Sequence, residues 1–298
     1  MDLNKIHHCN NLDLMPQLED ESIDVILTDP PYLYLKNQKL DRPFDETVFF
    51  NECKRVLKKD GFIVLFGRGT SFYRWNTILA DLGFDFKEEI IWNKIFNSSP
   101  VTPIQRFHET ISIHTIGKGI INKVKVPYLE IREYNFDRII GDIKRISSSL
   151  NNTKELNNLK KYIIDKKKTI VKMRNNTVSG CTVSPNSTGI FSVPVATLDK
   201  ILKECSERSI IDIVHDRFTR IHPTQKPVRL LERLLALVSK EGDVVLDPFS
   251  GSGSTAIACY NMNRNFIACE IDKEYYDLSI ERLNGATQQL KLPLTTNN

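Results

Sequence analysis

The amino-acid sequence predicts an α/β fold, a doubly wound and mostly parallel sheet that is interrupted by one inserted region. Two observations support this prediction. Short, almost continuous apolar runs alternate with longer segments of helical spacing, which is the order that parallel strands with crossover helices require. The alternation stops near residue 120 and resumes near residue 215, and the 298 residues are enough for one large domain with an insert.

The strand candidates are apolar runs that end in polar or turn-forming residues. Near-continuous apolar runs are typical of strands that helices cover on both faces. The candidates span residues 23–28, 61–67, 86–92, 109–117, 243–249 and 265–272.

Helical segments lie between these runs. Segment 45–61 begins with acidic residues, ends with basic residues and stops at Gly61, which suits the dipole of a helix. Segment 226–242 has a proline near its first turn and stops at Gly242. The other helix candidates are 70–83, 253–263 and 273–283.

The middle of the chain has a different composition. We expect residues 1–119 and 218–298 to form one domain and residues 120–217 to form the insert, with a helix from Lys154 to about Asp165. Residues 121–220 hold 19 lysines and arginines against 11 aspartates and glutamates, a balance of +8, whereas the rest of the chain is slightly acidic. A basic insert suggests binding to a polyanion, although a solvated basic surface has the same composition.

Composition also bounds where the chain acts. No apolar run approaches the roughly 18 residues that a membrane span needs, and the N-terminus lacks a secretion pattern. The six cysteines form no C-x-x-C pair. We therefore expect neither a disulfide framework nor a metal site, and we expect a cytoplasmic location.

The first strand candidate ends in "TDPPYLY", residues 28–34. Two successive prolines can continue neither a helix nor a central strand, so the chain must turn there. Ligands of doubly wound sheets bind at the carboxyl ends of the strands. Asp29 is therefore predicted to lie at a binding edge, although a simple strand-ending turn could contain the same residues.

A second strand candidate runs into a loop of small residues, "LDPFSGSGST" at 246–255. Glycines let the backbone approach a ligand closely, and a helix N-terminus offers free N–H groups. Glu270 ends the next strand candidate, at the spacing where an acid would accept from both hydroxyls of a ribose. The loop has no P-loop lysine, so the predicted ligand is a nucleoside without a triphosphate.

The loop "HPTQKP", residues 222–227, precedes an amphipathic helix candidate. Thr224 could cap that helix, and Lys226 could meet an anionic ligand at its N-terminus. A helix cap with a surface lysine would explain the same residues.

Taken together and in this order, the motifs resemble those of the β-class DNA amino-methyltransferases, which use S-adenosylmethionine. "DPPY" looks like the catalytic motif of that family, "DPFSGSGST" with "CEID" looks like its cofactor-binding pair, and "HPTQKP" looks like the loop that precedes them. "IIWNK" at 90–94 and "RFHETISIHTIGKG" at 106–119 are similar to its connecting segments. The resemblance covers residues 1–119 and about 218–284, and it implies a Rossmann-like, seven-stranded methyltransferase fold with a target-recognition insert.

The resemblance implies roles for individual residues. The Asp29 carboxylate and the Pro30 carbonyl would accept from the two N–H bonds of an exocyclic amine, Pro31 would stiffen the turn, and Tyr32 would stack on a flipped base. The family usually has an aspartate where this chain has Asn10, with Asp13 as the alternative register. The implied cofactor-binding residues are Asn10, Asp29, Thr224, Lys226, Asp247, Phe249, Ser250, Gly251, Ser252, Gly253 and Glu270.

An aspartate in the first motif position resembles the adenine-N6 enzymes, whereas the cytosine-N4 enzymes more often carry serine there. Cytosine-N4 methylation, a catalytically silent DNA-binding protein of the same fold and an RNA or protein methyltransferase remain alternatives. Double-stranded DNA is the expected partner, and a second copy of the chain and a cognate restriction endonuclease are further candidates. The basic residues expected to contact DNA are Lys166, Lys167, Lys168 and Arg174.

Overall fold

The computed structural model describes residues 2–32, 41–95, 103–132, 135–150, 205–214 and 220–289. The chain divides into two compact units. The first contains residues 1–124 and 208–298, and the second contains residues 125–207. The expected helix at 154–165 and the four basic residues expected to contact DNA lie outside the described residues.

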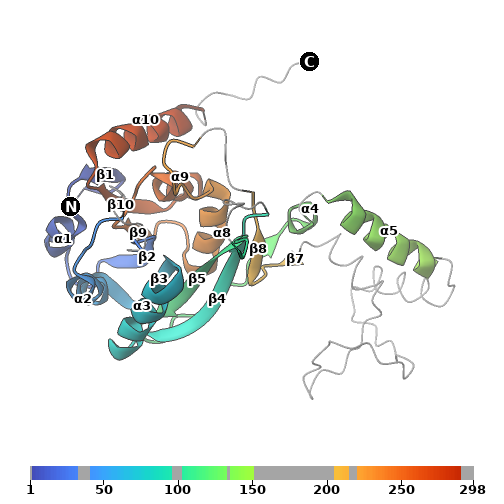
Figure 1. Cartoon of the computed structure of the whole chain (residues 1–298), viewed down its shortest axis with the longest axis horizontal. Helices are drawn as coiled ribbons and strands as arrows, with labels where there is room; N and C mark the ends of the chain where they lie inside the picture. The colour runs from blue at the N-terminus through green and yellow to red at the C-terminus, as the bar shows by residue number, and fades with distance from the viewer. Residues whose placement is uncertain are drawn as a thin grey trace. The chain divides into compact units, whose positions relative to one another are not determined.

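The first unit is built on one twisted sheet (Figure 1). In the described part of the chain its strand order is β1-β10-β9-β2-β3-β5-β4-β8. All neighbouring strands pair in parallel except β5, which is antiparallel to both β3 and β4. The strands are β1 (Lys5–His8), β2 (Ile23–Thr28), β3 (Leu57–Gly67), β4 (Asp85–Asn93), β5 (His108–Thr115), β8 (Ile210–Asp212), β9 (Val244–Asp247) and β10 (Asn265–Glu270).

Helices cover both faces of this sheet, which confirms the predicted fold class (Figure 1). Alternate residues of a strand point to opposite faces, so Val25 of β2 joins one core and Ile26 joins the other. The helices are α1 (Asn11–Leu14), the 3₁₀ helix η1 (Met15–Gln17), α2 (Glu46–Val56), α3 (Gly69–Asp81), α8 (Val228–Val238), α9 (Ser254–Asn261) and α10 (Lys273–Gln289). α1, α2 and α3 supply the core around Ile26, whereas α8 and α9 supply the core around Val25.

Several predicted element ends differ from the structure, and the end of α2 is the one with a clear physical reason. The helix expected at 45–61 begins as predicted, with the Asp45 carboxylate accepting from the Val48 N–H, but α2 ends at Val56. Leu57 already belongs to β3, where it pairs with Ile23 of β2 and is 1% exposed. Burial of Leu57 and its pairing with β2 outweigh the helical spacing of the sequence around it.

The sheet also has two edge strands that the sequence did not predict. β1 pairs with β10, and β8 pairs with β4. β8 comes from the region expected to belong to the insert, and it adds an eighth strand to the seven that the family resemblance implies. Both strands are short, so neither contains enough residues for a visible apolar period.

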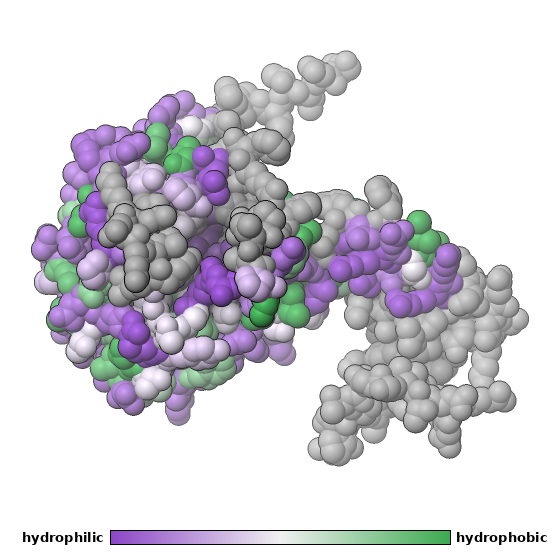
Figure 2. Space-filling view, in the orientation of Figure 1, coloured by the Kyte–Doolittle hydropathy of each residue, from purple (hydrophilic) through white to green (hydrophobic). Residues whose placement is uncertain are grey.

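The described part of the second unit contains β6 (Lys125–Val126), α4 (Tyr128–Ile131), α5 (Phe136–Leu150) and β7 (Cys205–Ser206). β6 and β7 pair antiparallel. The buried Asp142 of α5 accepts a hydrogen bond from the Tyr128 hydroxyl and pairs with Arg132 and Arg145. Figure 2 shows mainly hydrophilic side chains over the segment that Figure 1 labels α5.

Among the described residues, no helix is both long and apolar enough to cross a membrane.

Candidate active site

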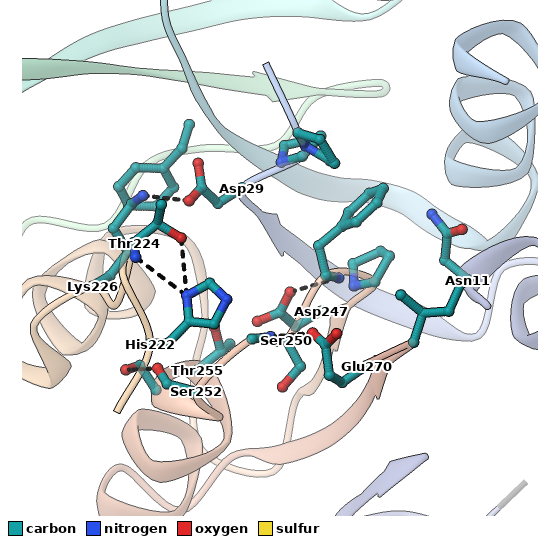
Figure 3. A pocket seen from close by; sticks show the side chains of 18 of the residues that line it. Asn11, Asp29, His222, Thr224, Lys226, Asp247, Ser250, Ser252, Thr255 and Glu270 are labelled. Atoms are coloured by element: carbon teal, nitrogen blue, oxygen red, sulfur yellow. Dashed lines mark hydrogen bonds and ion pairs between the residues drawn. The ribbon is translucent and has the colours of Figure 1, made fainter. Parts of the chain in front are cut away.

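The carboxyl ends of three neighbouring parallel strands open onto one cavity of about 710 Å³ (Figure 3). β2 ends just before Asp29, β9 ends at Asp247 and β10 ends at Glu270. All three carboxylates line the cavity, although they come from distant parts of the sequence. The other predicted site residues that line it are Asn10, Pro30, Pro31, Tyr32, Thr224, Lys226, Phe249, Ser250, Gly251 and Ser252.

Asp29 is held from two sides. One of its oxygens accepts a hydrogen bond from the Tyr32 hydroxyl at 2.5 Å, and the other accepts one from the Lys226 ammonium. Burial raises the pKa of the Asp29 carboxyl, and the negative charge of Glu109 adds to this, against the opposing effect of Lys226. Because an ionised carboxylate has about four lone-pair sites, Asp29 can still accept further hydrogen bonds from a substrate.

Tyr32 makes contacts through its backbone, its ring and its hydroxyl. Its carbonyl accepts a hydrogen bond from the Ser71 hydroxyl at 2.6 Å, and its ring lies 6.1 Å from that of Trp75, between ring centroids. The half-buried ring therefore packs against one core while its hydroxyl reaches Asp29.

The loop between β9 and α9 contains two glycines with positive φ, Gly251 at 50° and Gly253 at 71°. The ring of His222 packs over Gly251, at 3.5 to 3.6 Å from where a Cβ would lie. Gly253 caps α9 in the left-handed conformation and is not among the residues that line the cavity. Gly253 was expected to bind the cofactor, but in this structure it shapes the backbone at the start of α9, whereas Gly251 lies at the cavity itself.

Glu270 holds this loop in place. Its two carboxylate oxygens accept from the backbone N–H groups of Gly251 and Asp272, both at 2.8 Å. Burial raises the pKa of the Glu270 carboxyl, although these hydrogen bonds oppose the effect. Each oxygen retains lone pairs for a ligand.

Asp247 is more deeply buried, with 5% exposure. It accepts a hydrogen bond from the Phe249 N–H at 3.1 Å. Burial raises the pKa of the Asp247 carboxyl to about 7, against the effect of hydrogen bonds from Thr255 and Phe249. A cation that binds beside Asp247 would lower this pKa, so near neutral pH the carboxyl would release its proton to solvent on binding.

Several polar groups of the cavity wall have no hydrogen-bond partner in the described structure. Among them are the side-chain amide nitrogens of Asn11 and Gln225 and the hydroxyl of Ser250, and all three residues are buried. Buried polar groups are normally paired, so these three indicate a site that a polar ligand completes.

The loop 222–227 differs in one respect from its prediction. Thr224 does not cap α8, because the N-cap residue is Pro227 and no side chain caps the helix. Instead, the N–H and hydroxyl of Thr224 lie 3.3 and 3.1 Å from Nδ1 of His222. Burial lowers the pKa of His222 to about 4, and the nearby charge of Lys226 contributes. A neutral His222 therefore packs between this loop and Gly251.

Asn10 lines the cavity and also caps α1, because its side-chain oxygen accepts from the Leu12 N–H at 2.9 Å. Asp13 is exposed and is not among the residues that line the cavity. Of the two registers considered for the adenine contact, the structure therefore places Asn10 at the cavity. Phe249 lines the same wall and packs edge-on against Phe44 and Phe49.

Glu109 and Lys94 are among the charged residues of the site that were not assigned a role from the sequence. Glu109 and Lys94 line the cavity and form an ion pair with each other, and Glu109 also lies 3.2 Å from the Lys226 ammonium. Burial acts to raise the pKa of Glu109, but Lys226 and Lys94 outweigh it and lower the value to about 2. The pKa of Lys226 is raised, because Asp29 and Glu109 outweigh the effect of its burial.

A family model described as DNA methylase matches residues 23–281. A type II methyltransferase of Bacillus subtilis, M.BglII, is 28% identical over 296 residues, which cover 95% of this chain and 69% of the relative. M.HpaI of Haemophilus parainfluenzae, also a type II methyltransferase, is 29% identical over 290 residues, which cover 93% of this chain and 73% of the relative.

Solved structures share this fold. The M1.HpyAVI–SAM complex is 19% identical with a TM-score of 0.53, and the match covers 93% of this chain and 98% of that one. The cytosine-N4-specific PvuII DNA methyltransferase is 14% identical with a TM-score of 0.57, and the match covers 97% of this chain and 93% of that one. At these identities the likeness concerns the fold alone.

Proposed function

We propose that this chain, which belongs to the DNA methylase family of amino-methyltransferases, transfers a methyl group from S-adenosylmethionine to the N6 amine of adenine in duplex DNA. One observation carries the proposal. Asp29 of the "DPPY" motif lines the same cavity as the glycine loop and Glu270, so an amine-binding acid and a nucleoside-binding loop face one space. In the sequence, Asp29 and the loop are more than two hundred residues apart.

The cavity fits S-adenosylmethionine. Glu270 would accept from the ribose hydroxyls, Phe249 would contact the adenine ring, and Asp247 would face the cationic end of the cofactor. The unpaired amide nitrogens of Asn11 and Gln225 and the hydroxyl of Ser250 provide hydrogen-bonding groups for its polar atoms. When bound, S-adenosylmethionine supplies a methyl group that is attached to a positively charged sulfur. The sulfur keeps the electron pair of the carbon–sulfur bond that breaks.

The residues around Asp29 prepare the target amine. The lone pair of an exocyclic amine is delocalised into its base, which makes it a poor nucleophile. Two acceptors at its N–H bonds, the Asp29 carboxylate and the Pro30 carbonyl, would favour a pyramidal nitrogen and turn the lone pair toward the methyl group. Pro30 and Pro31 keep that carbonyl fixed because their φ angles are locked. Asp29 is also a candidate to take the proton that the amine loses.

We assign adenine as the target because the motif begins with aspartate. Cytosine-N4 methylation is the second candidate, since the fold is shared with a cytosine-N4-specific enzyme and the same chemistry serves both amines. A catalytically silent DNA-binding protein is disfavoured, because Asp29, Pro30 and Tyr32 all line the cavity.

The target base would have to leave the duplex to reach Asp29. Tyr32 provides an aromatic face at the cavity for stacking, with its hydroxyl held by Asp29. We propose that the basic insert, of which residues 125–207 form the second unit, reads the DNA sequence, with phosphates contacted by lysines and arginines. Type II relatives suggest that a restriction endonuclease accompanies the chain.

The test uses purified protein, unmethylated plasmid DNA and S-adenosylmethionine with a labelled methyl group. After digestion to nucleosides, the label is expected in N6-methyladenine. Label in N4-methylcytosine would show that the target is cytosine, which is the second candidate. Cofactor binding without transfer to any DNA would point to the silent protein, and transfer to RNA in a parallel reaction would change the substrate class.

A further inference from the structure

Two carboxylates share one buried ammonium at the active site. The Lys226 Nζ donates a hydrogen bond to Asp29 and lies 3.2 Å from Oε2 of Glu109. The Lys226 side chain is 8% exposed and its ammonium also lies 5.0 Å from the centroid of the Phe66 ring. Lys226 is therefore a buried cation held between two anions.

Glu109 is itself held from the far side. Its other carboxylate oxygen accepts a hydrogen bond from Lys94, which lies over the ring of Trp92 at 5.1 Å from the centroid. The result is a row of alternating charges, Asp29, Lys226, Glu109 and Lys94, in which the signs balance.

Strand direction brings this row together. β5 runs antiparallel to β3 and β4, so Glu109 near its start lies at the sheet edge where the parallel strands end. Glu109 pairs with Trp92 in the register of β4 and β5, and Lys94 follows the last residue of β4. Asp29 follows the last residue of β2, at the same carboxyl-terminal end of the parallel strands.

We propose that Glu109 is a positioning residue for methyl transfer, acting on Asp29 through the ammonium of Lys226 that the two carboxylates share. This inference rests on the proposed function. Glu109 holds the ammonium in place and partly neutralises its positive charge. Asp29 is then a stronger acceptor for the amine hydrogen, because the ammonium attracts its electrons less. Without Glu109, Lys226 would pair with Asp29 alone and compete with the substrate for its lone pairs.

A pH profile distinguishes this role from simple charge balance. The titratable groups that interact with Asp29 are Tyr32, Lys226, Glu109 and Asp247, and Lys226 also acts on His222. The charge of Glu109 is one of the causes that raise the pKa of Asp29, and it is not among the causes that shift the pKa of Asp247. Loss of that charge should therefore move the acidic limb of the kcat profile to lower pH.

The experiment compares Glu109→Gln with the wild type, with Glu89→Gln as the matched control on the exposed side of β4. Labelled methyl transfer to unmethylated DNA is measured at saturating cofactor between pH 5.5 and 9. For Glu109→Gln we expect kcat to fall by about 10- to 100-fold, less than for a group that contacts the amine itself. The acidic limb should move down by about one pH unit, and KM for S-adenosylmethionine should change by less than about threefold.

A second variant, Glu109→Gln combined with Lys94→Gln, removes one charge of each sign and keeps the site balanced. We expect it to stay slow with the acidic limb still displaced. It also provides the comparison if Glu109→Gln alone does not fold.

Three results would overturn the inference. They are a Glu109→Gln variant with wild-type kcat, a loss of kcat with an unmoved acidic limb, and recovery of both by the balanced double variant. A wild-type protein that transfers no methyl group to DNA would instead refute the proposed function, and the inference with it.

Discussion

The ammonium of Lys226 donates a hydrogen bond to the carboxylate of Asp29, although 197 positions of sequence separate the two residues. This contact joins the "DPPY" turn after β2 to the loop that precedes α8. Lys226 was expected to meet an anionic ligand, and the anions that it meets in this structure are Asp29 and Glu109. The catalytic motif and the loop before α8 therefore form one electrostatic unit.

Replacement of Asp29 by alanine should nearly abolish methyl transfer. The change removes one of the two acceptors at the target amine, and we expect kcat to fall by at least about 100-fold. Initial rates of labelled methyl incorporation measure this, with the exposed Asp81→Ala in α3 as the control. Near-normal turnover of Asp29→Ala would remove Asp29 from the catalytic role.

Replacement of Glu270 by alanine should weaken cofactor binding. The change leaves the ribose hydroxyls and the Gly251 N–H without their acceptor. We expect this loss to cost about 1–3 kcal/mol of binding free energy. Calorimetric titration with S-adenosylmethionine gives the affinity, and Glu274→Ala, an exposed acid in the first turn of α10, is the control. An unchanged dissociation constant for Glu270→Ala would contradict the ribose contact.

The affinity for S-adenosylmethionine should rise as the pH rises through about 7. Burial raises the pKa of Asp247 to about 7, so the unliganded protein holds a proton there that a cationic ligand would displace. Proton release favours binding at higher pH by linkage. Titrations at pH 6, 7 and 8 measure the effect, and Asp247→Asn should remove it. A pH dependence that persists in Asp247→Asn would assign the proton to another group.

Two glycine substitutions should change stability in opposite directions. Gly253 has φ of 71° at the start of α9, so alanine there should lower the free energy of unfolding by about 1–2 kcal/mol. Gly285 lies inside α10 with open space around it, so alanine should raise that free energy by about 0.5–1 kcal/mol. Urea denaturation compares both with the wild type. Equal stability of all three proteins would show that the backbone shape of the loop at Gly253 has no energetic cost.

The sequence was most informative where local pattern and tertiary role agree. β2 is found at the predicted residues 23–28, because its apolar run is covered on both faces and two prolines end it. The glycine loop and Glu270 were predicted to lie together, and the Gly251 N–H does donate to the Glu270 carboxylate.

It was least informative where tertiary contacts decide. Leu57 lies in a helical pattern but pairs with Ile23 as a strand residue, and no local feature marks that change. Glu109 lies near the start of a strand, where no sequence pattern gave a reason to expect a site residue. The antiparallel direction of β5 brings it to the cavity. Thr224 does not form the expected cap, because its hydroxyl interacts with Nδ1 of His222 and the helix starts after Pro227.

The most direct test of the central claim is single-molecule sequencing of DNA from methylation-deficient cells that express this protein. We predict N6-methyladenine at one fixed sequence motif, and unmodified adenine at that motif in cells that express Asp29→Ala. Modified cytosines in place of adenines, or the same adenine signal from the Asp29→Ala protein, would contradict the account.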